Sequence, residues 1–409
     1  MKKTISNIIL LIAVTSLLKA QSNSQQQPVF MSLDSVISIA MQNNPTLQSA
    51  QLSVVQQQKF KKTAWDLGKT GVFYENEDFI KNEMDNKGIL KIGFTQTIDF
   101  PTTYYTQNKF NKQSVIVAQS SFTLAQKEIL RDVRSGYFKL WRAVERQRLF
   151  QQQDSIFTEF ATAADLRFKT GETNRLEFIS AQAKQKEIQL ALQSANADIL
   201  IAQQEIMRLL NYTHPILPTN GSMQKLQVQI QNNQLSPASH PLLNVYQQKV
   251  TLTNYQRKVE SNRLLPNFSA RYFNQNWYGT SPGYYGYSFG IGIPLFFWGQ
   301  QGKIQGAKFQ QQIAQKDFEA ITLQFNAGYN QAVQELNKQQ QLLAYYESTG
   351  VQYADEILNS AQLAFKNGEI GYIEYIILLS QGIDIKNNYL SALSNYNEAI
   401  IQINYYINQ

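Results

Sequence analysis

A long internal repeat constrains this chain more than any other feature of its sequence. The segment Phe168–Glu172 has a counterpart in Phe365–Glu369, 197 residues further along. An acidic residue followed by an aromatic one comes next in both places, at Glu177–Phe178 and Glu374–Tyr375. A repeat of this length in a chain of 409 residues predicts two structurally equivalent halves. Each half is expected to hold a helix, a pair of strands, a very long helix, a short break and a return helix.

The N-terminus predicts an export signal. Lys2 and Lys3 form a positive start ahead of Ile8–Leu18, an apolar stretch too short to span a bilayer. Ala20 then offers a small residue for cleavage before Gln21. An uncleaved anchor is the alternative. Residues 1–20 are therefore left out of the fold prediction.

The composition excludes several classes of site and partner. Cysteine is absent, which excludes disulfides, thiolate metal sites and a lipid-bearing cysteine. The net charge of +7 falls to +4 when Lys2, Lys3 and Lys19 leave with the signal, and so mild a charge is no sign of nucleic-acid binding. No later stretch is apolar for long enough to form a transmembrane helix. An exported chain of this kind is periplasmic, secreted or built as an outer-membrane barrel.

Two stretches alternate in the way that strands do. Leu90–Phe100 puts apolar side chains on one face and polar or small ones on the other, and Tyr285–Leu295 repeats the pattern. With their partners they predict strand pairs at about 70–100 and about 267–297. Such faces fit lipid outside a barrel and water inside it, and a soluble sheet packed on helices is the alternative. The residues predicted to face lipid are Leu90, Ile92, Phe94, Ile98, Tyr287, Phe289, Ile291 and Ile293.

Long helices are expected after both strand pairs. No proline occurs between Pro101 and Pro215, and the segment from about 103 to 168 predicts one helix roughly 100 Å long. Such a helix cannot be the core of a compact domain, so it must lie against equally long neighbours. Its apolar residues recur at coiled-coil intervals, as do those of the return helix that follows. The two series are Ile129, Val133, Gly136, Leu140 and Ala143, and then Leu176, Ala183, Leu190 and Ala197.

These patterns divide the chain into four parts. They are a signal peptide at 1–20, a first structural repeat at 21–211 with its hairpin turn at 169–173, a linker at 212–237, and a second structural repeat at 238–409 with its hairpin turn at 366–370. The linker is rich in proline and is expected to be irregular. The two histidines, His214 and His240, are expected to be loop or helix-start residues.

In this order of elements the chain resembles the TolC-like outer-membrane efflux duct family, the outer membrane factors of tripartite pumps. The resemblance is carried by Asn44–Pro45, by the strand-to-helix junctions Asp99–Pro101 and Pro294–Gly299, and by the turns around Gly171 and Gly368. It implies a mixed membrane protein and a homotrimer. Each protomer would give four strands to a shared twelve-stranded transmembrane β-barrel, continuous with a long α-helical coiled-coil barrel. Independently, four strands with open edges cannot close a barrel in lipid, whereas three copies supply twelve.

The resemblance also implies a function. The chain would be a passive exit duct in the outer membrane, with its helical barrel in the periplasm. Its cargo would be small solutes (drugs or metal ions), delivered by a periplasmic adaptor protein and an inner-membrane transporter of the proton-driven type. The barrel would be surrounded by outer-membrane lipid. A duct for polypeptide secretion and a soluble periplasmic coiled-coil adaptor or scaffold are the alternatives.

No chemistry of its own is expected from the chain. We find no catalytic constellation, no cofactor motif and no cluster of metal ligands in the sequence. We therefore expect no enzymatic activity, and no nucleic acid is expected as a partner.

Glu374 and Glu177 are the candidates for a periplasmic gate, because each stands six residues past its turn glycine. In the family, acidic residues at the position of Glu374 and one helical turn later line the constricted periplasmic mouth. Here Ile377 stands at the second position, so one carboxylate ring is expected rather than two. The alternative is a structural role at a helix start, with Asn174 and Glu177 as a variant capping box.

The two hairpin turns are candidates for contact with the adaptor. The alternative is turn chemistry alone, because glycine supplies a positive φ. The residues concerned are Lys169, Gly171, Glu172, Lys366, Gly368 and Glu369.

Overall fold

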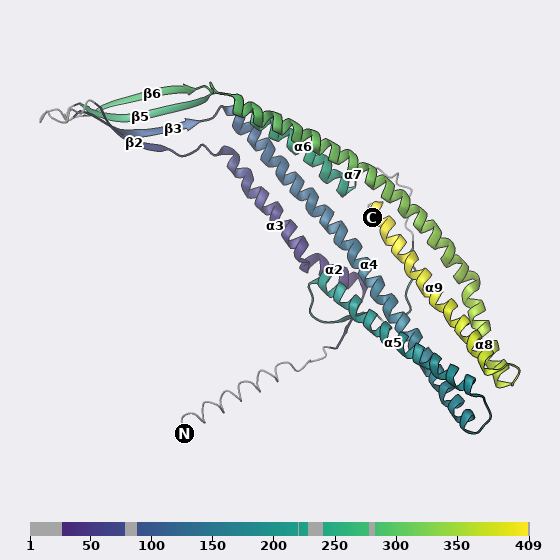
Figure 1. Cartoon of the computed structure of the whole chain (residues 1–409). Coiled ribbons are helices and arrows are strands. Elements are labelled where there is room, and N and C mark those ends of the chain that lie inside the picture. Colours follow the sequence, from purple (N-terminus) through teal and green to yellow (C-terminus); the bar gives the residue numbers. More distant parts are fainter. Residues whose placement is uncertain (1–26, 78–87, 220, 228–239, 278–282, 408–409) are drawn as a thin grey trace, which may run out of the picture. The chain divides into compact units, whose positions relative to one another are not determined.

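The computed structural model of the chain describes residues 27–77, 88–219, 221–227, 240–277 and 283–407 (Figure 1). The predicted export signal at 1–20 and parts of the predicted linker lie outside these residues. The chain divides into two compact units. The hairpin unit contains the chain up to Ala40, Val133–Lys225 and Tyr345–Ser394, and the sheet unit contains Met41–Asp132, Leu226–Ala344 and Asn395–Gln409.

Helices make up most of the described chain. They are α2 (Leu33–Asn43), α3 (Pro45–Phe60), the 3₁₀-helix η1 (Lys61–Trp65), α4 (Pro101–Lys169), α5 (Arg175–Leu210), α6 (Pro241–Asn262), α7 (Trp298–Tyr345), the π-helix η3 (Tyr346–Gly350), α8 (Val351–Lys366) and α9 (Tyr372–Tyr406). The strands are β1 (Val29–Met31), β2 (Gly71–Glu77), β3 (Ile89–Ile98), β4 (Ile216–Pro218), β5 (Asn267–Trp277) and β6 (Tyr284–Gly292). Within the described ranges, no helix is both long and apolar enough for a membrane-spanning segment.

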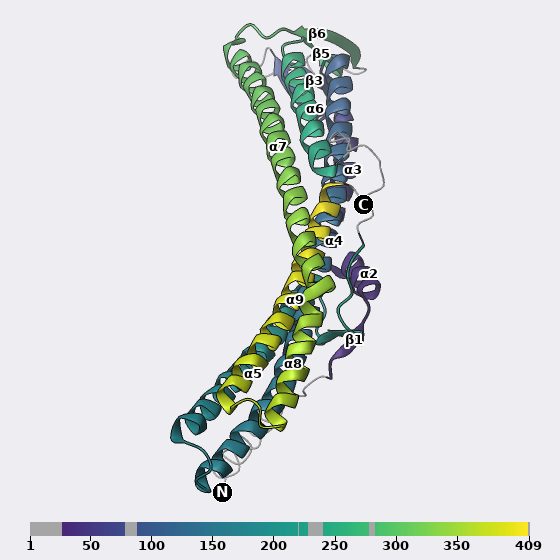
Figure 2. The same cartoon turned by 90° about the vertical axis from the view of Figure 1, so that its right-hand side faces the viewer.

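α4 confirms the prediction of one uninterrupted helix, since it runs for 69 residues. Pro101 is its first residue, where the missing N–H costs no helical hydrogen bond. Val133 and Leu140, two of the predicted coiled-coil positions, are fully buried. In the hairpin unit α5 runs beside the end of α4, and α8 runs beside α9 (Figure 2). The long helices thus pack on each other along their lengths.

The second long helix differs from the first because a π-helical turn, η3, separates α7 from α8. The apolar periodicity of the sequence did not predict this turn. A π-turn takes up one extra residue within a continuing helix. At Gly350 an added Cβ would lie 2.8 Å from the Tyr346 ring, so glycine is needed where this turn ends.

β2, β3, β5 and β6 form one antiparallel sheet in that order (Figure 1). Within the described residues β2 and β6 each have one neighbour and are the edge strands. β6 ends at Gly292, so Ile293 lies one residue beyond the strand to which it was assigned from the sequence. Pro294 accounts for the early end, because proline has no N–H to donate to a neighbouring strand.

A short parallel pair that the sequence did not predict joins the start of the described chain to the linker. β1 pairs with β4, with Val29 opposite Ile216. The Tyr137 hydroxyl donates to the carbonyl oxygen of Met31 at 2.9 Å, and the Gln203 amide donates to that of Ile216 at 3.0 Å. This part of the linker is therefore anchored on the hairpin unit.

α3 and α6 start in the same way, with a side-chain cap followed by proline. The Asn44 side chain accepts hydrogen bonds from the backbone N–H groups of Thr46 and Leu47. Nδ1 of His240 accepts from the N–H of Leu242 at 3.2 Å. Both positions are therefore helix starts, which for His240 is one of the two predicted alternatives.

His240 can act as a cap only while its ring is neutral. Its Nε2 lies 2.8 Å from the carbonyl oxygen of Tyr405, which places the ring hydrogen on Nε2 and leaves Nδ1 as the acceptor. The side chain is 1% exposed. Burial, assisted by the nearby charge of Lys127, lowers the pKa of His240 to about 4.

We predict that His240→Asn reduces the acid sensitivity of the fold. In the unfolded chain the histidine takes up a proton near pH 6.5, but in the folded chain only near pH 4. Stability supplied by the neutral ring is therefore complete above pH 6.5 and is lost as the pH falls toward 4. Asparagine keeps the cap, as Asn44 shows, and does not titrate. Thermal unfolding midpoints in detergent between these pH values measure the difference.

His214→Asn is the control, because it removes the other histidine without touching a helix cap. A parental pH slope in His240→Asn would contradict the assignment of that slope to the cap.

Candidate functional sites

One face of the sheet is apolar from edge to edge. A row of paired residues crosses the four strands as Val72, Phe94, Tyr272 and Tyr287, and the Phe94 and Tyr272 rings lie 5.6 Å apart. The row is exposed in the single chain. Further exposed apolar residues of this face are Tyr74, Ile92, Ile98, Phe289 and Ile291, and Leu90 is half-buried.

The opposite face carries paired charges. Arg271 on β5 bonds to Glu75 on β2, and Lys91 on β3 bonds to Glu77 at 2.6 Å. The Arg271 guanidinium also lies 4.1 Å from the centroid of the Phe73 ring. The sheet therefore has one face suited to hydrocarbon and one suited to water, as the alternation in the sequence predicts.

Both hairpin turns have the same backbone geometry. Gly171 and Gly368 have φ of 77° and 75°, which favours glycine. The N–H of Glu172 donates to the carbonyl of Arg167 at 2.8 Å, and that of Glu369 donates to Ala364 at 2.9 Å. The N–H groups of Gly171 and Gly368 donate to the carbonyls of Phe168 and Phe365 at 3.2 and 3.1 Å, which completes a Schellman motif in each turn. The shared glycine thus has a sufficient structural cause.

A pair of stacked rings closes each hairpin. Phe168 and Phe178 are 5.1 Å apart and nearly parallel in the first hairpin. Phe365 and Tyr375 are 4.7 Å apart at 13° in the second. Phe160 of α4 packs on Tyr375 at 4.8 Å, so the two hairpins meet in one aromatic cluster.

Glu177 is half-buried at the start of α5. Its carboxylate accepts a short hydrogen bond from the Thr173 hydroxyl, and its backbone N–H donates to the Asn174 side chain at 2.9 Å. This confirms Asn174 as the helix cap. The carboxylate also faces Tyr372 of the second hairpin: burial and then the charge of Glu177 raise the pKa of Tyr372 to about 12.

Tyr372 is a site residue that the sequence did not reveal. It is 5% exposed, and its hydroxyl is buried without a hydrogen-bond partner. In the repeat it stands where the first half has Arg175. That departure from the repeat was the signal available in the sequence.

Glu374 lies apart from Glu177, on the exposed side of α9. It is in the first turn of the helix, and Ile377, Gln381 and Asp384 continue the exposed side along α9. Ile377, at the second gate position, is 60% exposed. The structure thus groups Glu177 with the aromatic cluster and leaves Glu374 open to a neighbour.

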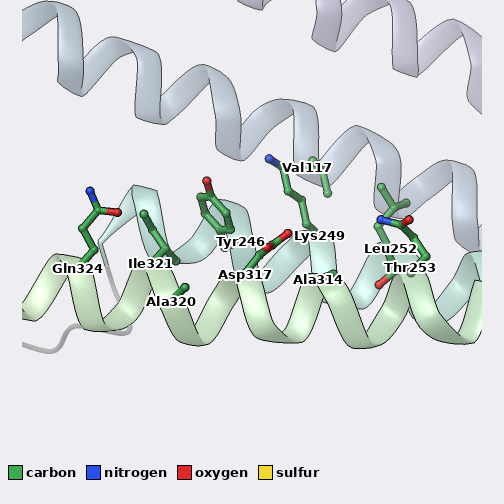
Figure 3. A pocket seen from close by; sticks show the side chains of 11 residues that line it. Val117, Tyr246, Lys249, Leu252, Thr253, Ala314, Asp317, Ala320, Ile321 and Gln324 are labelled. Atoms are coloured by element: carbon green, nitrogen blue, oxygen red, sulfur yellow. The ribbon is translucent and has the colours of Figure 1, made fainter.

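A groove of about 630 Å³ lies between α4, α6 and α7 in the sheet unit (Figure 3). Lys249 of α6 and Asp317 of α7 bring one cation and one carboxylate to it. No histidine or second carboxylate accompanies Asp317 in the lining of this groove. Its lining is Val117, Tyr246, Lys249, Leu252, Thr253, Gln310, Ala314, Asp317, Ala320, Ile321 and Gln324. In the described part of the chain no three acidic or histidine side chains gather as a metal site would need.

We predict that Tyr372→Phe leaves the fold as stable as before or stabilises it by about 1 kcal/mol, because it removes a buried hydroxyl that has no partner. Tyr137→Phe is the matched control. It removes a buried hydroxyl that is bonded to Met31 and is expected to destabilise by about 1 kcal/mol. Thermal unfolding of both variants measures the effect. Equal destabilisation would mean that the Tyr372 hydroxyl has a partner after all.

Known proteins share this fold over almost the whole chain. The Campylobacter jejuni CmeC outer membrane channel matches with a TM-score of 0.79 at 14% identity, over 92% of this chain and 85% of that chain. The Neisseria gonorrhoeae MtrE outer membrane channel in its open state matches at 0.76 and 16%, over 92% and 88%. The outer membrane protein VceC of Vibrio cholerae matches at 0.75 and 13%, over 92% and 95%. No curated protein sequence matches the chain significantly.

The fold is that of a TolC-like outer-membrane channel. Residues 233–376 also match the family model described as outer membrane efflux protein. This match over part of the chain and the shared fold both agree with the resemblance seen in the sequence.

Proposed function

We propose that the chain is the outer-membrane exit duct of a tripartite efflux system. It conducts small solutes passively, drugs or metal ions, from a periplasmic adaptor and a proton-driven inner-membrane transporter to the outside. The observation that carries this proposal is a sheet with one exposed apolar face and two unpaired edges, joined directly to helices too long for a compact domain. A soluble coiled-coil adaptor would explain the helices but not the apolar face of the sheet.

The duct is a homotrimer. A sheet edge in hydrocarbon leaves backbone groups without partners, so β2 and β6 must meet the edges of other copies. Three copies of four strands give a barrel of twelve. The two hairpins of each copy, which the internal repeat relates to each other, then form one continuous helical barrel.

α5 offers the contact that such a trimer needs. One series of residues at seven-residue spacing, Ala181, Ile188 and Ala195, is buried within the chain. A second series at the same spacing includes Leu176 and Leu190. These two side chains are 65% and 68% exposed. We assign the second series to packing against a helix of the next protomer.

We predict that Phe289→Arg impairs insertion into lipid, because Phe289 is 80% exposed on the apolar face of β6. A charge at the lipid face of a barrel costs about 2–4 kcal/mol near the bilayer midplane. Ser288→Arg adds the same charge to the water-facing side of the same strand, opposite Arg271, and is expected to cost less, about 0.2–1 kcal/mol from the like charges. Folding yield into lipid vesicles measures both. Equal yields would contradict the assignment of the faces.

We assign a gate to the periplasmic mouth. Three copies of Glu374 around a threefold axis repel each other as the mouth narrows, which favours cations over anions in the opening. The exposure of Glu374 in the single chain supports this role. Glu177 differs from Glu374, because its half-buried carboxylate accepts from the Thr173 hydroxyl and its charge helps to raise the pKa of Tyr372.

We predict that Glu374→Gln lowers the cation selectivity of single channels in planar bilayers, because it removes the ring of charge. Glu369→Gln, which removes an exposed acid from the adjacent turn, is the control. Unchanged reversal potentials in Glu374→Gln would remove Glu374 from the gate.

We assign the adaptor contact to the two turns. Lys169, Gly171 and Glu172 in the first turn are exposed, as are Lys366, Gly368 and Glu369 in the second. Lys169 forms an ion pair with Asp165 at 2.6 Å. Within the described residues, Glu172 is therefore the charged side chain of the first turn that has no ion-pair partner. Polypeptide cargo remains the alternative within this proposal, since the same tunnel serves either cargo.

A further inference from the structure

The segments that join the sheet to the helices concentrate positive charge. Residues 59–70, 99–112, 257–266 and 294–308 hold eleven Lys and Arg against three Asp and Glu, a net charge of +8. The whole chain carries only +7. The net positive charge is therefore gathered at one end of the helices, while the rest of the chain has a net charge of −1, or −4 without the three lysines of the predicted export signal. We call these four segments the basic collar.

All four segments belong to the sheet unit and adjoin the same end of the sheet, where its strands meet the helices (Figure 1). Lys61 and Lys62 are in η1, which leads to β2, and Arg263 follows α6 just before β5. Lys303 is in the second turn of α7, after β6. Lys61, Lys62 and Lys303 are exposed, and none of them is ion-paired within the described residues, whereas Arg263 is bonded to Glu260.

Exposed aromatic rings occupy the same segments. Phe296 and Trp298 at the start of α7 are 80% and 67% exposed, and Tyr105 of α4 is 59% exposed. Trp65 of η1 is 61% exposed although it stacks on Tyr104 at 5.9 Å. Aromatic rings beside lysines are the side chains that sit at the level of lipid headgroups.

We propose that the basic collar binds the headgroups of anionic phospholipids in the leaflet on the helical side of the barrel. This rests on the proposed function, since the apolar face of the sheet must lie in a bilayer for the collar to reach the headgroups. Positive charge within a Debye length of an anionic surface is attracted to it. The rings enter the interface and the ammonium groups contact the phosphates. The chain then selects phosphatidylglycerol over zwitterionic lipid.

The test compares lipid retention by three trimers. Lys61→Gln/Lys62→Gln/Lys303→Gln removes three collar charges, and Arg142→Gln/Lys186→Gln/Arg208→Gln removes three exposed charges elsewhere on the helices. Each protein is placed in nanodiscs of phosphatidylcholine alone or mixed with phosphatidylglycerol, and native mass spectrometry counts the lipids retained per trimer. The same spectra report whether the trimer has formed.

We call the first triple variant the collar variant and the second the helix variant. The parent and the helix variant are expected to retain about threefold more phosphatidylglycerol than phosphatidylcholine at low salt. This preference is expected to weaken at high salt. The collar variant is expected to lose this preference while remaining a trimer. Equal retention of both lipids by the parent trimer would overturn the collar proposal and leave the duct intact. A change in anion permeability without a change in lipid retention would place the lysines in the lumen and overturn it too. Failure of the parent to form a trimer would instead overturn the proposed function.

Discussion

The backbone hydrogen bonds at the two edges of the sheet are the constraint on which the rest of the structure depends. β2 and β6 each have a partner on one side within the described chain. In water an open edge finds solvent, but in hydrocarbon each unpaired group costs several kcal/mol. The apolar row from Val72 to Tyr287 is the reason for proposing that this sheet meets hydrocarbon. An apolar face with open edges is stable only if copies close the ring.

The long helices also have apolar surface that needs a partner. A helix of 69 residues cannot bury its apolar side within one compact core, so it must share that side with other long helices. α5 uses one heptad series inside the chain and leaves a second, with Leu190 at 68% exposure, for a neighbour. Because one series is buried and the other is exposed, α5 can pack within its own hairpin and also against a neighbouring protomer in the proposed helical barrel.

The sequence was most informative where a single period ran for many residues. The alternation of β3 and the absence of proline across α4 predicted those elements nearly to their ends. Periodicity could not decide between the two heptad series of α5, because both have the same spacing and only packing separates them. The stripe chosen from the sequence, from Leu176 to Ala197, is the exposed one.

Short elements and contacts between distant segments could not be predicted from the sequence. The π-turn η3 inserts one residue into an otherwise helical pattern, and β1 and β4 are three residues each, too short for any alternation to show. At the hairpins, the lysine, glycine and glutamate of the repeat were visible, but Tyr372 was not. Tyr372 is buried with Ala164 and Ala181 of the first hairpin, and no local pattern encodes such a contact between the two hairpins.

The mass of the purified, signal-free chain tests the account most directly. In detergent, native mass spectrometry should give a single species of three chains, because only closure of the ring satisfies the edges of the sheet. A stable, monodisperse monomer in buffer without detergent would contradict the account, since an open apolar sheet of this kind could not then be what the chain exposes.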